Sequence, residues 1–417
     1  MKNLVVIGGG TAGTLVANQL VEKVSTDWSV TVVDPDPVHL YQPGLVFLPF
    51  GVRDEPKMLR PREKTFRRGI HWLQRTVEEI DTDKRRVIVQ NHDPIAYDLL
   101  ILATGSRICP EETEGLTGEA WQRSIFDFYT LEGAQKLRDA MASFEEGRVV
   151  VNVVEMPIKC PVAPLEFLFL ADAFFTKRGI RDRIELVYAT PLDGAFTKPV
   201  ASSLLGSMLE QKGVRVESEF NAGSVDAGAR VLSSWDERKI PFDLLVTVPT
   251  HKGAEFIEAT GFGDDLAFVP TEPATLKAKN FDNIFVLGDA TDLPTSKAGS
   301  VAHFQGSVVV ENVLRAMRGQ SLSEGFDGHA NCFVESGFGK ALLIDFNYDV
   351  EPLPGKFPLP VLGPMSLLKE SRLNHWGKLA FRWVYWNALL PGRPLPISDR
   401  MSMAGKIQPD LAQTKSA

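Results

Sequence analysis

The sequence has few cysteines, no long apolar run and no excess of positive charge. Three cysteines in 417 residues are too few for a secreted disulfide framework. No run reaches the ~18 apolar residues of a membrane-spanning helix, and no leader precedes the first strand, so we expect no signal peptide. A net charge of -8 argues against nucleic acid as a partner. The seven histidines are scattered, so we expect no metal site.

The N-terminal stretch "NLVVIGGGTAG" predicts a dinucleotide site. A short apolar strand leads into Gly8, Gly10 and Gly13, and an apolar helix follows. The glycines allow a tight turn and a close approach of the backbone to a pyrophosphate, which the helix N-terminus then attracts. A second strand, "WSVTVVD", ends at Asp34, about 20 residues further on, where a carboxylate can bind a ribose hydroxyl.

Two later strands decide which dinucleotide is bound. "YDLLILATGS" ends in Ala103, Thr104 and Gly105, and "NIFVLGDATD" ends in Gly288 and Asp289. In this order the motifs resemble those of flavoproteins with two dinucleotide-binding domains. There the first motif marks the crossover between domains, and the Asp of the second holds the ribityl-phosphate region of FAD. The resemblance therefore implies FAD as the cofactor.

The expected fold is α/β, with two nested Rossmann-like domains and a C-terminal membrane-associating region. The FAD-binding domain is split into residues 1–105 and 282–319, and a second Rossmann-like domain spans 106–281. Within that domain "FDLLVTVPT" echoes "YDLLILATG", as expected for two similar folds. From about residue 320 to 417 the α/β alternation stops and glycine, proline and aromatic residues increase.

A helix predicted to begin near Ala298 points its N-terminus at the flavin in such relatives. Its dipole would favour the anionic reduced flavin. Lys297, just before it, either adds to this effect or is a solvated lysine at the start of a helix.

The second domain lacks a phosphate-binding turn. After the strand "RVVVNVV" the chain reads "EMPIKCPVAPLEF", with no glycine between Gly147 and Gly179. Proline lacks the N–H that a phosphate cradle uses, so we expect that this domain binds no nucleotide and that a reductant other than NAD(P)H serves the flavin. Cys160 in this turn is the candidate for delivering the electrons, and Cys332 is its candidate partner.

These motifs together resemble the sulfide:quinone oxidoreductases and the flavoprotein subunits of flavocytochrome c sulfide dehydrogenase. The resemblance covers essentially the whole chain. It implies that Cys160 and Cys332 lie by the isoalloxazine, bridged by a disulfide or a short sulfur chain. It further implies that sulfide is oxidised to sulfane sulfur or polysulfide and that two electrons pass through FAD to a membrane quinone. Glu166 matches a carboxylate of some relatives, as a base or as a helix cap. Cys109 departs from the usual third-cysteine spacing and is either a sulfur relay or a buried spectator.

The C-terminal stretch "ESRLNHWGKLAFRWVYWNALLPG" predicts an amphipathic helix, with Lys378 and Arg382 on its polar face. Its tryptophans suit a helix that lies in a membrane interface, although a helix packed on its own core or in a dimer is the alternative. In the family this region anchors the enzyme to the bilayer surface as a peripheral, monotopic protein and forms a quinone channel. The aromatic candidates for quinone contact are Phe333, Phe346 and Tyr348.

Three other functions remain open. A type II NADH:quinone oxidoreductase conflicts with the glycine-free turn. A flavocytochrome c subunit would carry an export signal and would not need the aromatic helix. A non-catalytic FAD-bound redox sensor would be reduced by sulfide without turnover. Product chain length, quinone type and whether the chain forms a homo-oligomer are not determined by the sequence.

Overall fold

The computed structural model describes residues 1–52, 55–358, 363–395 and 397–408. Its first unit is built on a parallel five-stranded sheet with the order β20-β9-β1-β2-β5. The strands are β1 (Lys2–Ile7), β2 (Trp28–Val33), β5 (Ile70–Leu73), β9 (Leu99–Leu102) and β20 (Ile284–Val286). The side chains of β9 and β20 are buried throughout, as expected for strands of a parallel sheet that is covered on both faces.

The second unit repeats this arrangement with the order β11-β18-β12-β13-β14, again all parallel. Its strands are β11 (Ile125–Phe126), β12 (Gly147–Val153), β13 (Ile184–Ala189), β14 (Val214–Glu217) and β18 (Leu244–Val248). The echoing segments of the sequence form β9 and β18, which each pair with the central strand of their sheet. The two Rossmann-like sheets expected from the sequence are therefore confirmed.

Seven α-helices are described. They are α1 (Thr11–Leu20), α2 (Leu131–Ser143), α3 (Ala163–Lys177), α4 (Pro199–Gln211), α5 (Glu255–Thr260), α6 (Gly299–Met317) and α7 (Arg372–Val384). α1 packs against α6 in the first unit, and α3 packs against α4 and the second sheet. Short 3-10 helices are η1 (Gln42–Phe50), η2 (Glu55–Met58), η3 (Arg62–Thr65), η4 (Pro110–Glu112), η5 (Arg181–Arg183) and η6 (Gly288–Ala290).

Small antiparallel sheets complete both units. The first unit carries β6 (Val77–Asp81), β7 (Arg86–Val89) and β8 (Ile95–Ala96), together with the pair β3 (Val38–Leu40) and β4 (Leu59–Pro61). The second carries β15 (Ala222–Asp226), β16 (Val231–Ser234) and β17 (Lys239–Pro241). A two-stranded ribbon of β10 (Arg107–Cys109) and β19 (Thr250–Lys252) carries the chain between the units.

The segment after β19 returns to the first unit earlier than expected. Ile257, Val269 and Ala278 share a buried cluster with residues of β1 and β9. We therefore propose that the second domain ends near Val248 rather than at residue 281.

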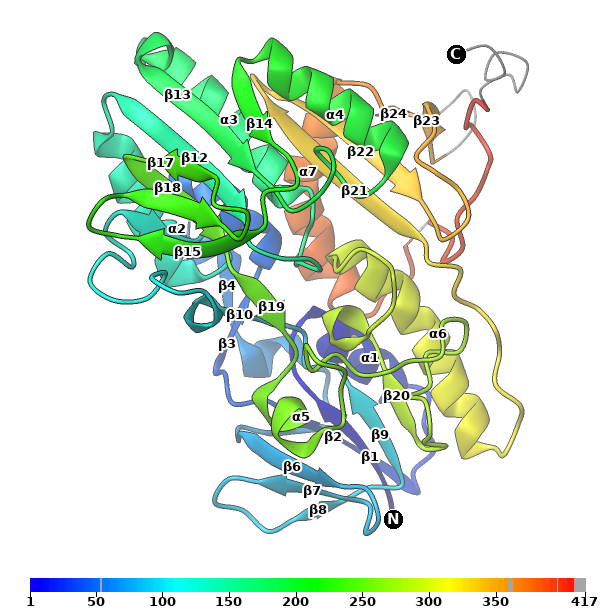
Figure 1. Cartoon of the computed structure of the whole chain (residues 1–417). Helices are drawn as coiled ribbons and strands as arrows, with labels where there is room; N and C mark the ends of the chain where they lie inside the picture. Colours follow the sequence, from blue (N-terminus) through cyan, green and yellow to red (C-terminus); the bar gives the residue numbers. More distant parts are fainter. Residues whose placement is uncertain (53–54, 359–362, 396, 409–417) are drawn as a thin grey trace.

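The C-terminal region forms a third layer. Its mixed sheet has the order β21-β22-β24-β23, with β21 (Ala330–Gly337), β22 (Lys340–Phe346), β23 (Gly355–Phe357) and β24 (Met365–Leu367). β21 runs along α3, and α7 packs across β21 and β22. Figure 1 shows α7, in orange, near the centre of the molecule. A π-helical turn, η7 (Tyr385–Leu389), continues α7.

The predicted apolar face of the C-terminal helix is only partly exposed. Trp376 and Trp383 are 66% and 68% exposed, and Leu373 is 56% exposed. Trp386, which the sequence placed among the interfacial residues, is buried and lies under the guanidinium of Arg60. It is buried because η7 packs into the core of the protein, whereas most residues of α7 stay at least partly exposed. No described helix is both long enough and apolar enough to cross a membrane.

Candidate active site

The turn after β1 requires glycine at two positions. Gly8 has φ +98°, and a Cβ there would lie 2.3 Å from the carbonyl oxygen of Ala103. A Cβ on Gly13 would lie 1.8 Å from the carbonyl oxygen of Gly8. Real Cβ atoms do not approach so closely, so the glycines let β1, α1 and the Ala103 segment meet. Thr104 and Gly105 follow, the latter with φ +69°.

The same turn leaves the N-terminus of α1 open. Its N-cap is Gly10, which makes no side-chain cap, and its first turn holds no acidic residue. A Cβ added to Gly10 would meet nothing within 4 Å. Free N–H groups, a positive helix end and space beside them suit a pyrophosphate. The residues present therefore fit FAD at this position.

Asp34 lies at the end of β2, as predicted. Its carboxylate accepts the N–H of Gly9 at 2.6 Å and that of Asp36 at 2.9 Å, and its Oδ1 lies 3.2 Å from Nε of Arg62. Burial raises the pKa of Asp34, and Arg62 opposes that shift. The carboxylate is thus oriented beside the glycine turn, where a ribose would lie next to the pyrophosphate.

The second FAD motif meets the first at the Gly288 turn. Gly288 has φ +72°, and its N–H donates to Oε1 of Gln305 in α6 at 2.6 Å. The half-buried side chain of Asp289 is approached by Oγ of Ser106 at 3.5 Å. Burial raises the pKa of Asp289, while the charges of Lys297 and Lys159 lower it.

Lys297 is buried, which excludes the solvated-lysine alternative. Its ammonium donates to the carbonyl oxygens of Asp289 and Thr291 at 2.8 Å each and lies 3.5 Å from the ring centre of Phe268. Burial lowers the pKa of Lys297 to about 8. Ala298 is the N-cap of α6 and makes no side-chain cap, so this helix end is also open.

The turn that carries Cys160 is fixed to the start of α6. The N–H of Cys160 donates to the carbonyl oxygen of Lys297 at 2.7 Å, and its own carbonyl accepts the N–H of Ala163 at 2.8 Å. Cys160 has φ +47°, a left-handed conformation that is uncommon for a residue with a Cβ. The backbone of this turn thus occupies the N-terminus of α3, and the turn brings Cys160 next to the start of α6.

Cys332, on β21, lies close enough to Cys160 to interact with it electrostatically. Burial raises the pKa of both thiols, and a charge on Cys160 would raise that of Cys332 further. Lys378 is the main charge that lowers the pKa of Cys160. Both side chains belong to or pack on one buried cluster. The fold therefore brings together two cysteines that are far apart in the sequence, beside the N-terminus of α6.

Glu166 is buried and engaged. It accepts the N–H of Glu335 at 2.7 Å and forms an ion pair with the ammonium of Lys378. That ammonium also donates to the carbonyl oxygen of Phe333 at 3.1 Å. Glu166 does not cap α3. The placement of Lys378 on an outer polar face was wrong, because its long side chain reaches inward to this buried carboxylate.

The three aromatic candidates do not lie together. Antiparallel register pairs Phe333 with Leu343 and Cys332 with Ile344, and side chains alternate between the faces of a strand. Phe333 and Phe346 therefore point to opposite faces of the sheet. Phe346 packs under Lys198, 5.5 Å from its ring centre, and Tyr348 packs against Phe326.

Cys109 lies on the ribbon between the units rather than on β21 or the α3 turn. It is fully buried, and Nη1 of Arg107 contacts its sulfur at 2.9 Å. Burial raises the pKa of Cys109 to about 11. These surroundings favour the neutral thiol.

Sequence reasoning missed a contact between the C-terminal segment and the FAD turn. The hydroxyl of Tyr385 lies 2.7 Å from Oγ1 of Thr11 and 2.7 Å from Nε2 of His39. Asn18 in α1 donates to the carbonyl oxygen of Leu390 at 2.9 Å. The run "YWNALLPG" could have suggested a buried segment, but its partners could not be read from the sequence. Deleting the chain from residue 371 would therefore disturb the FAD turn as well as the exposed helix face.

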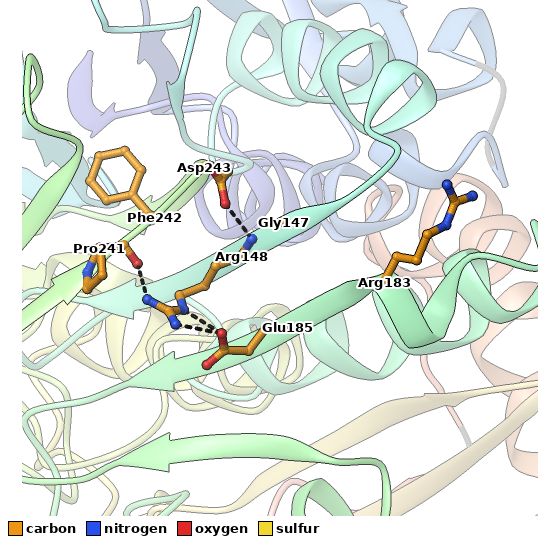
Figure 2. Close-up of a pocket in the computed structure, with 7 residues that line it drawn as sticks. All are labelled: Gly147, Arg148, Arg183, Glu185, Pro241, Phe242 and Asp243. Carbon is orange, nitrogen blue, oxygen red and sulfur yellow. Dashed lines mark hydrogen bonds and ion pairs between the residues drawn. The ribbon is translucent and has the colours of Figure 1, made fainter.

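A cavity of about 350 Å³ lies away from these residues (Figure 2). It is lined by Gly147 and Arg148 at the start of β12 and by residues next to the starts of β13 and β18. Arg148 is paired with Glu185 at 2.7 Å. Ligands of open parallel sheets bind at the carboxyl ends of the strands, and this cavity is at the amino ends.

Comparisons with known proteins agree with this geometry. Residues 2–152 match the pyridine nucleotide-disulphide oxidoreductase family. The chain is 25% identical over 398 residues to the mitochondrial sulfide:quinone oxidoreductase of Mus musculus, covering 93% of this chain and 86% of the relative. It is 27% identical over 416 residues to that of Schizosaccharomyces pombe, covering 92% and 89%.

Among solved structures, the sulfide:quinone oxidoreductase of Aquifex aeolicus superposes with a TM-score of 0.77 at 20% identity, covering 93% of this chain and 92% of that one. The predicted resemblance to this family is confirmed, and so are the α/β fold, the oxidoreductase class and FAD as the cofactor.

Proposed function

We propose that this chain oxidises sulfide to sulfane sulfur at Cys160 and Cys332 and passes the two electrons to a membrane quinone through FAD. One observation carries the proposal. The turn that would hold a second nucleotide instead holds Cys160 against the start of α6, next to Cys332. The relatives that match nearly the whole chain are named sulfide:quinone oxidoreductase, which supports the same substrates.

The cysteine pair accounts for the sulfur chemistry. Hydrosulfide attacks one sulfur of the oxidised pair, so a new S–S bond forms as the Cys160–Cys332 bond breaks, leaving a persulfide and a thiolate. Burial disfavours that thiolate, and the ammonium of Lys378 is placed to offset this at Cys160. FAD, when bound, accepts the two electrons from sulfur and gives them up to the quinone. The net change is HS⁻ + H⁺ + quinone → sulfane sulfur + quinol.

Glu166 is retained in the proposal as the partner of Lys378 rather than as a free base. Its negative charge holds the ammonium near Cys160 and the strand of Cys332. Replacing the carboxylate would release Lys378 and leave a buried cation without its partner.

Quinone access is proposed along α7. Phe333 faces this helix, and its ring would lie 3.1 Å from a Cβ added to Gly377. The exposed Leu373, Trp376 and Trp383 lie on the same helix and suit the interface of a bilayer. We therefore propose peripheral membrane attachment through α7 and a quinone ring beside Phe333. Phe346 and Tyr348 are not carried forward, because their packing directs them elsewhere.

Steady-state assay of the FAD-loaded enzyme tests the proposal. Sulfide should support reduction of decylubiquinone, and NADH should not. Turnover with NADH would instead favour a type II NADH:quinone oxidoreductase. Reduction of the flavin by sulfide without any turnover with quinone would favour a redox sensor. Turnover with cytochrome c in place of quinone would favour a flavocytochrome c-type subunit.

A further inference from the structure

A second buried carboxylate lies on the face of β21 that Phe333 occupies. Glu335 is two residues further along the strand, so its side chain points to the same face as Phe333. The residue is 1% exposed. Nδ1 of His375 in α7 lies 2.8 Å from Oε1 of Glu335. The side chain of His375 is 18% exposed, which gives this pair contact with solvent.

Other charged side chains on the neighbouring elements form ion pairs of their own. Glu166 on α3 is neutralised by Lys378 on α7. On β22 the ammonium of Lys340 is paired with Glu370 at 3.7 Å. Glu335 and His375 therefore form a carboxylate–imidazole pair that runs from the solvent side of α7 to the buried face of β21.

Quinone reduction needs a proton at this face. A quinone that gains two electrons takes up two protons as it becomes quinol. Reduced flavin in its anionic form carries one of these protons, so solvent must supply the other. Apolar side chains and the membrane would surround a quinone beside Phe333, and a proton crosses such surroundings through titratable groups.

We propose that His375 and Glu335 deliver this solvent proton to a quinone bound beside Phe333, an inference that rests on the proposed function. Water protonates the His375 imidazole at Nε2, and the ring gives its Nδ1 proton to the Glu335 carboxylate. Glu335 then gives its proton to a quinone oxygen as the electrons arrive. This leaves His375 as the Nε2–H tautomer, and a turn of the ring about its Cβ–Cγ bond brings the protonated nitrogen back toward Glu335. Each cycle then restores both residues and moves one proton inward.

The test separates the two half-reactions in the FAD-loaded enzyme. Glu335→Gln keeps the size and an oxygen that can face His375 but cannot carry the proton, and His375→Asn removes the imidazole. His71→Gln is the matched control, because His71 is exposed on β5. Stopped-flow absorbance follows flavin reduction by sulfide, then reoxidation of dithionite-reduced enzyme by decylubiquinone, in H₂O and in D₂O.

We expect reoxidation to slow about 10- to 100-fold in both variants, with a larger solvent isotope effect, while reduction by sulfide changes by less than about twofold. Added imidazole should restore part of the rate in His375→Asn. Unchanged reoxidation, or equal slowing of both half-reactions, would overturn the proposal and indicate no role or a structural one. Because dithionite supplies the electrons, failure of sulfide as a substrate in the wild type would be seen separately.

Discussion

The two parallel sheets of this molecule share four corresponding strands, β9-β1-β2-β5 and β18-β12-β13-β14, but differ in the loop that follows their central strand. After β1 the loop is made of glycines, and the N-terminus of α1 is uncapped and open. After β12 the loop holds prolines and Cys160. The carbonyl oxygen of Cys160 accepts the N–H of Ala163, the first residue of α3. Glu166 in the first turn of α3 would also repel a phosphate. The same architecture thus presents an open helix N-terminus after the glycine turn in one unit and a cysteine in the corresponding loop of the other.

The difference shows that the function of such a unit depends on one loop rather than on its sheet. A phosphate site needs free N–H groups and no Cβ in the way. The proposed redox thiol needs a fixed position. In this chain a main-chain hydrogen bond between Cys160 and Lys297 holds its turn at the start of α6.

The largest expected effect is loss of the thiols. Cys160→Ser and Cys332→Ser should each lower sulfide-dependent quinone reduction by at least about 1000-fold, since the covalent step cannot occur without both sulfurs. FAD should stay bound, because the glycine turn and Asp289 do not depend on the cysteines. Cys109→Ser is the control, and its activity should stay near that of the wild type. An equal loss of activity in Cys109→Ser would indicate that Cys109, on the ribbon of β10 and β19, takes part in the sulfur chemistry.

Substitutions of exposed tryptophans compare the contribution of α7 to membrane binding with that of the second unit. Trp376→Ala and Trp383→Ala should each weaken membrane binding by about 1–2 kcal/mol, because each removes apolar area that lipid would cover. Trp235→Ala is the matched control, since Trp235 is 78% exposed on the β15–β16 side of the second unit. Vesicle sedimentation measures the effect. Complete release of the wild type by high salt alone would show that charge, and not this face, holds the protein.

Glycine substitutions compare the two units directly. Gly13→Ala forces a Cβ against the carbonyl of Gly8 and should weaken FAD binding by about 1–3 kcal/mol. Gly206→Ala in α4 meets only an ordinary contact at 3.8 Å and should leave FAD binding unchanged. FAD release on dilution, followed by fluorescence, gives both values. Equal retention in the two variants would contradict the assigned role of the first turn.

The last expected effect concerns acid stability at the contact between Tyr385 and the first unit. Burial, aided by Arg62, lowers the pKa of His39 to about 3, below its unfolded value of about 6.5. His39 is therefore neutral when folded, and its stability contribution is present above pH 6.5 and falls as the pH drops toward 3. At pH 5 the loss is about 2 kcal/mol. His39→Gln should lose less stability than the wild type between pH 7 and pH 5 in urea unfolding. A pH-independent difference would contradict the neutral buried state.

Local patterns in the sequence were enough to predict the first unit, while the redox role of the Cys160 turn stays a prediction. Glycine spacing, buried strands and the acid at Asp34 act over short distances, so their geometry follows from their order. Contacts between distant segments could not be predicted in this way. Lys378 and Trp386 looked like residues of an exposed helix, yet one reaches Glu166 and the other packs under Arg60. Their burial depends on how α7 and η7 dock, which no local period reveals.

The most direct test of the account is an anaerobic titration of the FAD-loaded protein, followed by flavin absorbance. Sulfide should bleach the flavin stoichiometrically in the wild type and fail to do so in Cys160→Ser. NADH should leave the oxidised spectrum unchanged, because the loop after β12 offers no phosphate site. Rapid stoichiometric bleaching by NADH, with no response to sulfide, would contradict the central claim that a thiol has taken the place of a nucleotide.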